Sequence, residues 1–309
     1  MLQEDTAGDP MGRRGLWTGK RLRDISRELA HLGLRVCPNT VRRLLHEVGY
    51  ALHANRKSLS GRQSPERDRQ FHYIGHQRAQ FLQEALPMVS VDTKKKELVG
   101  PFKNAGRVWS REAIPVNDHD FPSLAKGIAI TRGLYDLQAN RGSIVIGTSH
   151  DTPQFAVDAL VDWWRDQGRE RYPGAWQLLL LADSGGSNSA RSRLWKYGLQ
   201  VKLVDPYQLA VTVCHYPTGA SKWNPIEHRL FSEISKHWAG QPLDEYSTMA
   251  RLVAGTKTQT GLRVPCSLSA KHYPTKVKVS DAQMATIDLL EHPVLPQWNY
   301  TLLPRQNRN

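Results

Sequence analysis

Cysteine, acidic residues and long apolar runs are all scarce in this 309-residue chain, and each shortage excludes a class of protein. The 3 cysteines lie far apart, so they form neither a disulfide framework nor a zinc-ligand spacing. No run of about 18 apolar residues is present, which argues against a transmembrane helix. The N-terminus also lacks the basic start and apolar core of a signal peptide. We therefore expect no membrane partner and a reducing, cytosolic compartment.

Acidic residues are outnumbered by basic ones, 29 Asp and Glu against 42 Lys and Arg, which gives a net charge of +13. The excess lies at the two ends, because residues 1–80 hold 15 basic against 8 acidic residues and residues 250–309 hold 8 against 3. Residues 81–249 hold 19 against 18 and are nearly neutral. This distribution favours a catalytic or packing module flanked by segments that bind nucleic acid. A basic surface that only maintains solubility is the alternative.

The first basic segment has the pattern of two short helices. Apolar and small residues at helical spacing predict one helix over 19–31, capped by Thr18, and a second from its cap at Asn39 or Thr40 to Val48. Two such helices with a tight connection resemble a helix-turn-helix, although many helical hairpins bind nothing. If this one binds DNA, its second helix would present polar and basic side chains to bases and phosphates. These residues are Asn39, Thr40, Arg42, Arg43 and His46.

Changes in composition divide the chain into three parts. A polar, basic linker over 51–63 follows the helical hairpin, so we predict a helix-turn-helix DNA-binding segment and linker over 1–63. A catalytic core is predicted over 64–240. The Lys- and Pro-rich residues 241–309 are predicted to be a basic C-terminal extension that packs on this core.

The predicted core begins with a helix and continues as strand, strand, strand, helix, strand, helix, strand, helix. Apolar runs at 88–92, 127–137 and 143–148 predict an antiparallel meander. The almost continuous apolar run at 176–183 is typical of a central strand that is covered on both faces, and 210–215 is the next strand. This is the order of an RNase H-like fold, an α/β architecture in which helices flank a mixed five-stranded sheet.

Three carboxylates are predicted to meet at one edge of this sheet. Asp92 ends the first strand, Asp183 ends the fourth strand beside it, and Glu227 lies in the first turn of the helix after the last strand. Without a compensating arginine the three would repel one another, and a divalent cation would relieve that repulsion. Hard oxygen ligands select Mg²⁺, with Mn²⁺ able to substitute. Two such ions about 3.5–4 Å apart are suited to phosphodiester chemistry.

Each carboxylate also has a structural interpretation. Asp92 is equally consistent with a cap on the turn after its strand, Asp183 with the start of a Ser-Gly-Gly turn, and Glu227 with a favourable helix dipole. Other carboxylates and two histidines are weaker candidates, which we rank below the three as rivals or structural residues: Asp120, Asp136, Asp151, His215 and His228.

A lysine cluster directly follows the first carboxylate. Lys94, Lys95 and Lys96, together with Lys222 near Glu227, are expected to hold DNA phosphates beside the site. Affinity that depends on such contacts falls steeply with salt.

Five stretches resemble the motifs of the Rhodopirellula-type DDE transposases of bacterial insertion sequences, which are distant relatives of the mariner-like group. The resemblance extends from about Gly8 to Tyr300. The stretches are Ser90–Gly100, His150–Pro153, Leu181–Asn188, Lys222–Phe231 and Tyr273–Asp281.

The resemblance implies that Asp92, Asp183 and Glu227 are the DDE triad of an RNase H-like core. It further implies two Mg²⁺ ions, cut-and-join chemistry on the terminal inverted repeats of the element, and a homodimer or higher oligomer on DNA in the nucleoid. Members of this family usually carry further N-terminal DNA-binding sequence, so we expect a shortened copy. Other positions depart from the family pattern. Ser184 and Lys276 stand where glycine is expected, Pro225 stands where a basic residue is expected, and the segment 197–210 is altered.

Three functions follow as hypotheses. The first is a transposase, and the second is a DNA-binding protein without catalysis, either a remnant or a repressor of transposition. The third is an RNase H-like nuclease that cleaves nucleic acid without joining it.

Overall fold

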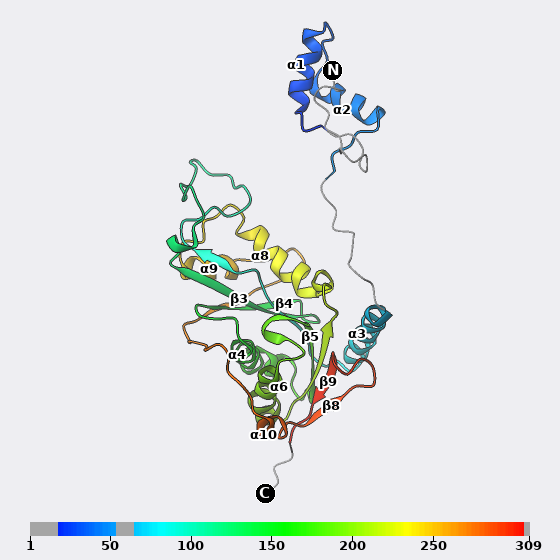
Figure 1. Ribbon diagram of the computed structural model, residues 1–309, viewed down its shortest axis with the longest axis vertical. Helices are drawn as coiled ribbons and strands as arrows, with labels where there is room; N and C mark the ends of the chain where they lie inside the picture. Colours follow the sequence, from blue (N-terminus) through cyan, green and yellow to red (C-terminus); the bar gives the residue numbers. More distant parts are fainter. Residues whose placement is uncertain (1–17, 54–64, 306–309) are drawn as a thin grey trace. The chain divides into compact units, whose positions relative to one another are not determined.

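The computed structural model describes residues 18–53 and 65–305, and these form two compact units. The first unit lies within 18–53 and the second within 65–305 (Figure 1). None of the helices in these ranges is long and apolar enough to cross a lipid bilayer.

The first unit is a pair of short helices, α1 (Leu22–His31) and α2 (Pro38–Glu47). Ile25 and Val41 are buried between them, and the Ser26 hydroxyl donates to the Val36 carbonyl at 2.6 Å. The predicted helices exist, but both predicted caps are wrong. The helix α1 follows Arg21, whose side chain makes no capping bond, and α2 has Cys37 as its N-cap with a proline in its first turn. Proline is suited to that position because its missing N–H would be unpaired there.

Five strands form the centre of the second unit. β1 (Met88–Thr93), β3 (Gly127–Asp136) and β4 (Arg141–Gly147) are an antiparallel meander, as predicted. β5 (Gln177–Asp183) runs parallel to β1, and β6 (Ala210–Tyr216) runs parallel to β5. The resulting order β4-β3-β1-β5-β6 confirms the RNase H-like α/β fold with a mixed sheet.

The sheet extends beyond these five strands to nine in the described part of the chain. β2 (Glu97–Val99) pairs with the first residues of β3. The predicted C-terminal extension supplies the rest: β7 (Cys266–Ser269) beside β4, β9 (Asn299–Leu302) beside β6, and β8 (Leu289–Glu291) beside β9. The sequence did not reveal these strands, because 3 or 4 residues are too few to display alternation.

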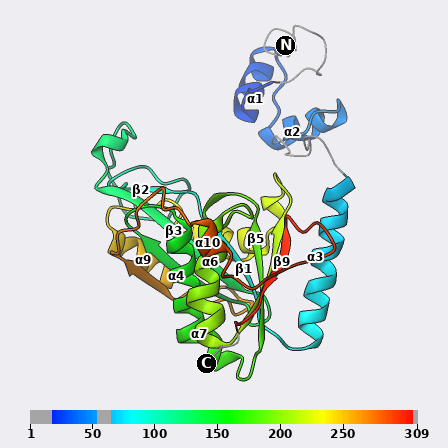
Figure 2. The same ribbon diagram turned by 60° about the horizontal axis from the view of Figure 1, so that its bottom comes forward.

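Helices cover both faces of the sheet (Figures 1 and 2). Alternate residues of β5 make this possible, since Leu178 and Leu180 face the cluster that contains α4 and α6, whereas Leu179 and Leu181 face α3. α8 and α9 pack over β3 and β4 on the second face. The helices are α3 (Pro65–Gln83), α4 (Pro153–Trp163), α5 (Arg169–Arg171), α6 (Arg193–Leu199), α7 (Asp205–Tyr207), α8 (Ser232–His237), α9 (Tyr246–Ala254) and α10 (Asp281–Met284).

Three π-helical segments extend these helices, and three short 3₁₀ turns lie in the loops. The π-helical segments are η2 (Trp164–Gly168), η4 (Gln200–Val204) and η6 (Glu227–Phe231). The 3₁₀ turns are η1 (Pro122–Leu124), η3 (Gly186–Asn188) and η5 (Ser221–Trp223).

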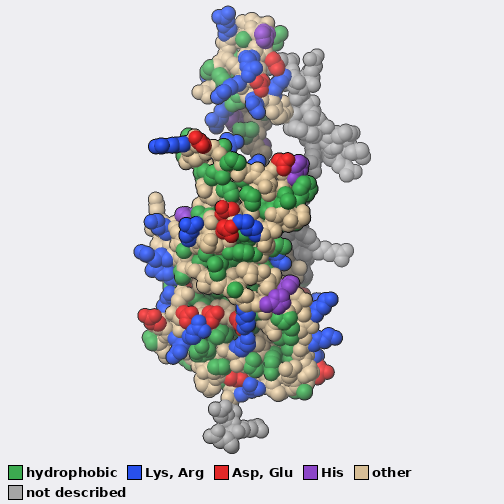
Figure 3. Space-filling view, turned by 90° about the vertical axis from the view of Figure 1, so that its left-hand side faces the viewer, with side chains coloured by type: hydrophobic (Ala, Val, Ile, Leu, Met, Phe, Trp, Pro, Cys, Tyr) green, Lys and Arg blue, Asp and Glu red, His purple; other side chains and the backbone are tan. Residues whose placement is uncertain are grey.

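The surface bears the positive charge that the composition predicts. Figure 3 shows Lys and Arg side chains spread over one face of the molecule and interspersed with Asp and Glu. On this face the basic excess is therefore distributed rather than gathered into a single patch.

Lys276 provides a test of local strain. It stands where the family pattern predicts glycine, and its φ of 60° is in the left-handed region that costs a side chain about 1–2 kcal/mol. We expect Lys276→Gly to raise the free energy of unfolding by about 0.5 kcal/mol, after the entropic cost of glycine. Urea denaturation would measure it. The matched control, Lys278→Gly at an exposed position with ordinary φ, should lower stability instead. Equal losses in both variants would contradict the assignment of strain.

Candidate active site

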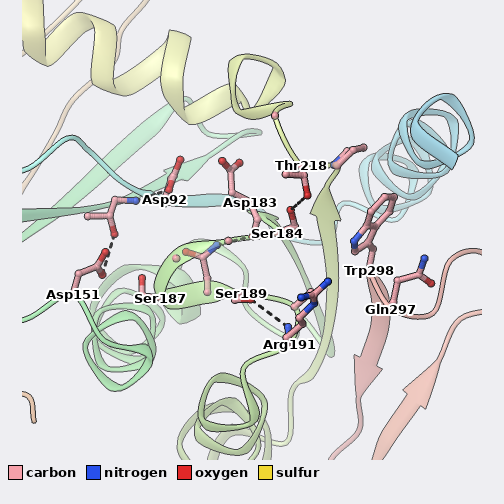
Figure 4. Close-up of a pocket in the computed structure, with 17 residues that line it drawn as sticks. Asp92, Asp151, Asp183, Ser184, Ser187, Ser189, Arg191, Thr218, Gln297 and Trp298 are labelled. Carbon is pink, nitrogen blue, oxygen red and sulfur yellow. Dashed lines mark hydrogen bonds between the residues drawn. The ribbon is translucent and has the colours of Figure 1, made fainter. Parts of the chain in front are cut away.

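The pairing of β1 with β5 brings two of the predicted carboxylates together. Val91 lies opposite Ala182 in this parallel register, so Asp92 and Asp183 leave their strands at the same edge of the sheet. Both line a cavity of about 830 Å³. Figure 4 shows the two side chains side by side at the strand ends, pointing in the same direction.

The lining of the cavity comes from strand ends, from two loops and from the segment before β9. Asp92, Asp151 and Asp183 contribute its carboxylates, and the loops Ser184–Arg191 and Pro217–Gly219 form much of its wall. Gln297 and Trp298, which precede β9, complete it.

Asp92 is largely buried, and one of its carboxylate oxygens accepts a hydrogen bond from the Thr93 amide at 2.7 Å. Burial, and next the negative charge of Asp183, raise the pKa of Asp92 to about 7, although the Thr93 amide and Arg132 oppose the shift. Glu227 adds a smaller contribution in the same upward direction. A carboxyl with this pKa is ionised only in part at neutral pH, so a nearby cation would strongly favour its charged form.

Asp183 is held by an asparagine that the sequence analysis did not identify. The Asn224 amide donates to the Asp183 carboxylate at 3.1 Å, and the Ser90 hydroxyl donates in turn to Asn224. Asn188 and His215 hydrogen-bond the Asp183 carbonyl at 3.1 and 3.0 Å. Burial raises the pKa of Asp183, and the bond from Asn224 partly offsets that rise. The only sequence signal for Asn224 is its place three residues before Glu227.

Glu227 lies at the start of η6 and is half-buried, but it is not among the residues that line the cavity. Burial, and next the charge of Asp183, raise its pKa, so the two carboxylates interact electrostatically. Across the described residues, no group of three or more His, Cys, Asp or Glu side chains is close enough to hold a metal ion. The three carboxylates therefore converge on one edge of the sheet without forming a complete ligand set.

The three rival carboxylates have different surroundings. Asp151 lines the cavity, and Thr93 donates a hydrogen bond to it at 3.3 Å. Asp136 is fully buried and pairs with Arg171 at 2.9 Å, which makes it structural. Asp120 is exposed and does not line this cavity. Asp151 therefore shares the cavity with Asp92, although the sequence analysis ranked it below the three main carboxylates.

Arg132 is a buried cation beneath the cavity, and the sequence analysis did not single it out. It is only 1% exposed, and its Nη1 donates to Thr93, Ser187 and Asn188 at 3.2, 3.1 and 2.9 Å. Its Nε and Nη2 have no hydrogen-bond partner within the described chain. Burial lowers its pKa, while the charges of Asp151 and Asp92 oppose this shift. An arginine inside a mostly apolar strand was the available signal, because burying an unpaired charge is costly.

The predicted phosphate-binding lysines differ in their availability. Lys94 is engaged within the protein, since its Nζ pairs with Glu97 at 2.7 Å and lies over the Trp238 ring at 4.6 Å. Lys95 and Lys96 are exposed. Lys222 is also exposed and packs over Trp223, with its Nζ 4.1 Å from the ring centre.

The predicted DNA-reading residues lie on α2, in the first unit. Asn39, Arg42 and Arg43 are exposed, and Arg43 forms an ion pair with Glu47 at 3.7 Å. Thr40 is half-buried, and its hydroxyl lies 3.3 Å from the Cys37 sulfur. The exposed polar side of α2 is thus available, with Thr40 turned partly toward the helix start.

The strand order and the flanking helices are those of an RNase H-like fold, and the carboxylate-lined cavity lies at the carboxyl ends of β1 and β5. The family model described as Rhodopirellula transposase DDE domain matches residues 1–304. The chain therefore belongs to this transposase family, and the resemblance seen in the sequence is confirmed. No curated protein matches it.

Several solved structures of the Mos1 transposase are similar to this chain at low identity. The paired-end complex with the left transposon end has a TM-score of 0.44 and 14% identity, covering 75% of this chain and 65% of that chain. The complex with Mn has a TM-score of 0.45 with the same identity and coverage, and the complex with Mg has 0.42 at 15%, covering 79% and 74%. The chain thus spans slightly less than two thirds of the Mos1 chain in the first two of these structures. These scores are too low to transfer a site or a substrate.

The chemistry of the cavity fits a divalent cation. Asp92 and Asp183 offer hard oxygen donors, and burial raises the pKa of each. Within the described residues, neither carboxylate forms an ion pair with a lysine, arginine or histidine. A divalent cation would supply the missing positive charge, with Asp92 and Asp183 as ligands and Glu227 or Asp151 as the nearest further carboxylates.

The raised pKa of Asp92 predicts a pH-dependent stability. Its pKa is about 7 in the folded state against an ordinary value of 3.8, so the metal-free folded protein binds more protons between these values. The free energy of unfolding should therefore fall as pH rises from about 4 to about 7. Asp92→Asn stays neutral, so at pH 8 in EDTA it should be more stable than the parent by on the order of 2–4 kcal/mol, at about 1.4 kcal/mol per pKa unit.

Denaturation with urea at several pH values would measure this difference, which should vanish near pH 4. Added MgCl₂ should stabilise the parent at pH 8 and leave Asp92→Asn unchanged. Asp120→Asn, at an exposed position, is the matched control and should follow the parent throughout. Parallel pH profiles for parent and Asp92→Asn would contradict the raised pKa.

Proposed function

We propose that this chain is a DNA transposase that cuts and joins the ends of an insertion sequence. The observation that carries this proposal is the position of Asp92 and Asp183 on paired strands, where both line one cavity and neither forms an ion pair within the described residues. Membership of the transposase family supports it. The proposed partners are the terminal inverted repeats and the target DNA, and the proposed active form is a homodimer or higher oligomer on DNA in the bacterial cytoplasm.

The proposed ligands are Asp92, Asp183 and Glu227, holding two Mg²⁺ ions or Mn²⁺ in their place. Bound divalent ions would activate the attacking oxygen and stabilise the leaving oxygen. Water would first break a phosphodiester bond at the element's end and leave a free 3′-hydroxyl. This hydroxyl would then displace a 3′-oxygen in target DNA and join the strands.

The residues of the chain have defined parts in this proposal. Asn224 fixes Asp183, and the Thr93 amide fixes one oxygen of Asp92, so both carboxylates are held on rigid strand ends. Lys95, Lys96 and Lys222 are exposed and available for phosphates. Lys94 contributes only if it leaves Glu97 and Trp238.

A strand-transfer assay with MgCl₂ and the DNA that flanks the gene as the donor tests the proposal. Asp92→Ala, Asp183→Ala and Glu227→Ala should each reduce cutting on the order of a thousandfold, because each removes a metal ligand. Asp120→Ala is the control and should cut as the parent does.

Asp151→Ala decides which carboxylate completes the ligand set. A loss with Asp151→Ala but not with Glu227→Ala would replace Glu227 by Asp151 while the function stands. Undiminished cutting by Asp92→Ala and Asp183→Ala would overturn the proposal.

The second candidate is a DNA-binding protein without catalysis. It is favoured by one observation, that no three acidic or histidine side chains in the described residues are close enough to hold a metal. It predicts DNA binding that is insensitive to EDTA and no cutting under any condition. Cutting without joining would instead indicate a nuclease.

DNA binding through α2 is testable separately. We expect Arg42→Ala to weaken binding to duplex DNA and to reduce the slope of log affinity against log salt by about one. Arg43→Ala should have a smaller effect, because Arg43 already pairs with Glu47 at 3.7 Å. Fluorescence anisotropy at several NaCl concentrations would measure both. Arg165→Ala, whose guanidinium pairs with Asp162 and Asp166, is the control, and an equal loss in it would contradict a role for α2.

A further inference from the structure

The cavity has a second end that the carboxylates do not explain. Gln297 and Trp298 line it from the segment before β9, and Arg191 lines it from the loop before α6. Figure 4 shows Trp298 and Gln297 on the opposite side of the view from Asp92 and Asp151. One cavity therefore combines an acidic end with an end that carries an aromatic ring and a guanidinium.

The backbone of Trp298 is held firmly on both sides. Its amide donates to the Leu295 carbonyl at 2.8 Å across a turn in which Leu295 has a φ of 48°, in the left-handed region. Its own carbonyl accepts from the His215 amide of β6 at 3.0 Å. This turn costs a leucine on the order of 1–2 kcal/mol, so surrounding contacts must stabilise it.

A buried amide pair provides that support. Asn299 is fully buried, and its side chain donates to the Val294 carbonyl at 2.8 Å and to the Gln70 side chain at 2.7 Å. Gln70 donates back to Asn299 at 2.8 Å and to the His215 carbonyl at 2.9 Å. The loop that carries Trp298 is thus fastened to α3 and β6, which fixes where the indole enters the cavity.

Open space separates Trp298 from the carboxylates. Gly185, Gly186 and Gly219 line the cavity, and a β-carbon added at any of them would meet nothing within 4 Å. The hydroxyls of Ser184 and Thr218 lie 3.3 Å apart in the same wall. A ligand in this space would find hydroxyl and backbone groups along its length.

Arg191 adds positive charge on the side away from the carboxylates. It is exposed and lines the cavity, and no carboxylate among the described residues forms an ion pair with it. Its backbone amide donates to the Ser189 hydroxyl at 3.3 Å, which anchors the residue while its guanidinium remains available.

We propose that Trp298 and Arg191 form a subsite for one unpaired nucleotide of the DNA strand end. The base would stack on the indole, and a phosphate of the same strand would bind Arg191, while the neighbouring phosphate faces Asp92 and Asp183. The base must be out of the duplex, because both faces of a paired base are covered by its neighbours. This inference rests on the proposed function, since it assigns DNA to the cavity.

The chemistry of the cavity matches that of a nucleotide. A nucleotide has an anionic phosphate and a flat aromatic base, and the cavity offers the Arg191 guanidinium for the phosphate and the Trp298 ring for the base. Stacking of bases on aromatic side chains is independent of sequence and is worth about 1–3 kcal/mol per base. Gln297 lies beside Trp298 and could hydrogen-bond the edge of the stacked base.

A fluorescence titration tests the subsite without requiring catalysis. The probe is a 20-base-pair duplex with a five-nucleotide single-stranded 3′ overhang, in which one overhang position carries 2-aminopurine, with the full chain in CaCl₂. Stacking on indole should quench the emission at one or two overhang positions only. Trp298→Ala should abolish this quenching and weaken overhang binding about 5- to 150-fold, which corresponds to the 1–3 kcal/mol of one stacked base.

Matched variants separate stacking from folding. Trp298→Phe should retain part of the quenching and most of the affinity. Trp176→Ala removes a tryptophan that is 58% exposed next to the opposite end of β5, and it should behave as the parent. Arg191→Ala should reduce the salt dependence of binding by about one charge while the quenching remains. A thermal midpoint for each variant confirms that it is folded.

The outcomes distinguish this inference from the proposed function. Equal quenching in the parent and in Trp298→Ala, or equal losses in Trp298→Ala and Trp176→Ala, would overturn the subsite even if the strand-transfer assay succeeds. Position-specific quenching lost only in Trp298→Ala would support the subsite even if the chain cuts no DNA, in which case the proposed catalysis fails alone.

Discussion

Parallel pairing of β1 with β5 is the constraint on which the candidate site depends. Because Val91 lies opposite Ala182, the next residue of one strand and the next of the other are carboxylates at the same edge. A slip of one residue would turn every side chain of β1 to the other face and remove Asp92 from the cavity. The register is specified by burial, since Leu178 to Leu181 are all 0% exposed and each contributes about 1.5–3 kcal/mol. The apolar core thus holds the polar groups in place.

The polar groups at this edge form a connected but incomplete network. Asn224 bridges Ser90 to Asp183, and Arg132 joins Thr93 on β1 to Asn188 in the loop after β5. Satisfied buried groups of this kind rigidify a site. However, Nε and Nη2 of Arg132 have no hydrogen-bond partner among the described residues, and the charge of Asp183 raises the pKa of Asp92. Buried carboxylates that are costly to ionise on their own, and that a bound cation would stabilise, are typical of functional sites rather than of hydrophobic cores.

Much of the fold was predictable because its central strands have strong local signals. The run at 176–183 is typical of a buried strand, and 88–92, 127–137 and 143–148 are apolar runs separated by loop and turn residues. The outer strands β7, β9 and β8 were not predictable, since each is short and is defined by its partner rather than by its own pattern. The caps of α1 and α2 failed for a related reason. Several residues near the start of each helix are suited to the N-cap position. The backbone conformation of the folded chain places Arg21 and Cys37 at that position.

The sequence by itself determined the order of the central strands, the position of Asp92 and Asp183 at strand ends, and the family. These follow from periodicity and motif spacing, which are local properties. Only the tertiary structure decided which side chains share the cavity. It placed Asp151 and Trp298 there, left Glu227 outside the lining, and paired Lys94 with Glu97. The physical reason is distance along the chain. Asp92 and Trp298 are more than 200 residues apart, and no local pattern encodes a contact that depends on how the whole sheet assembles.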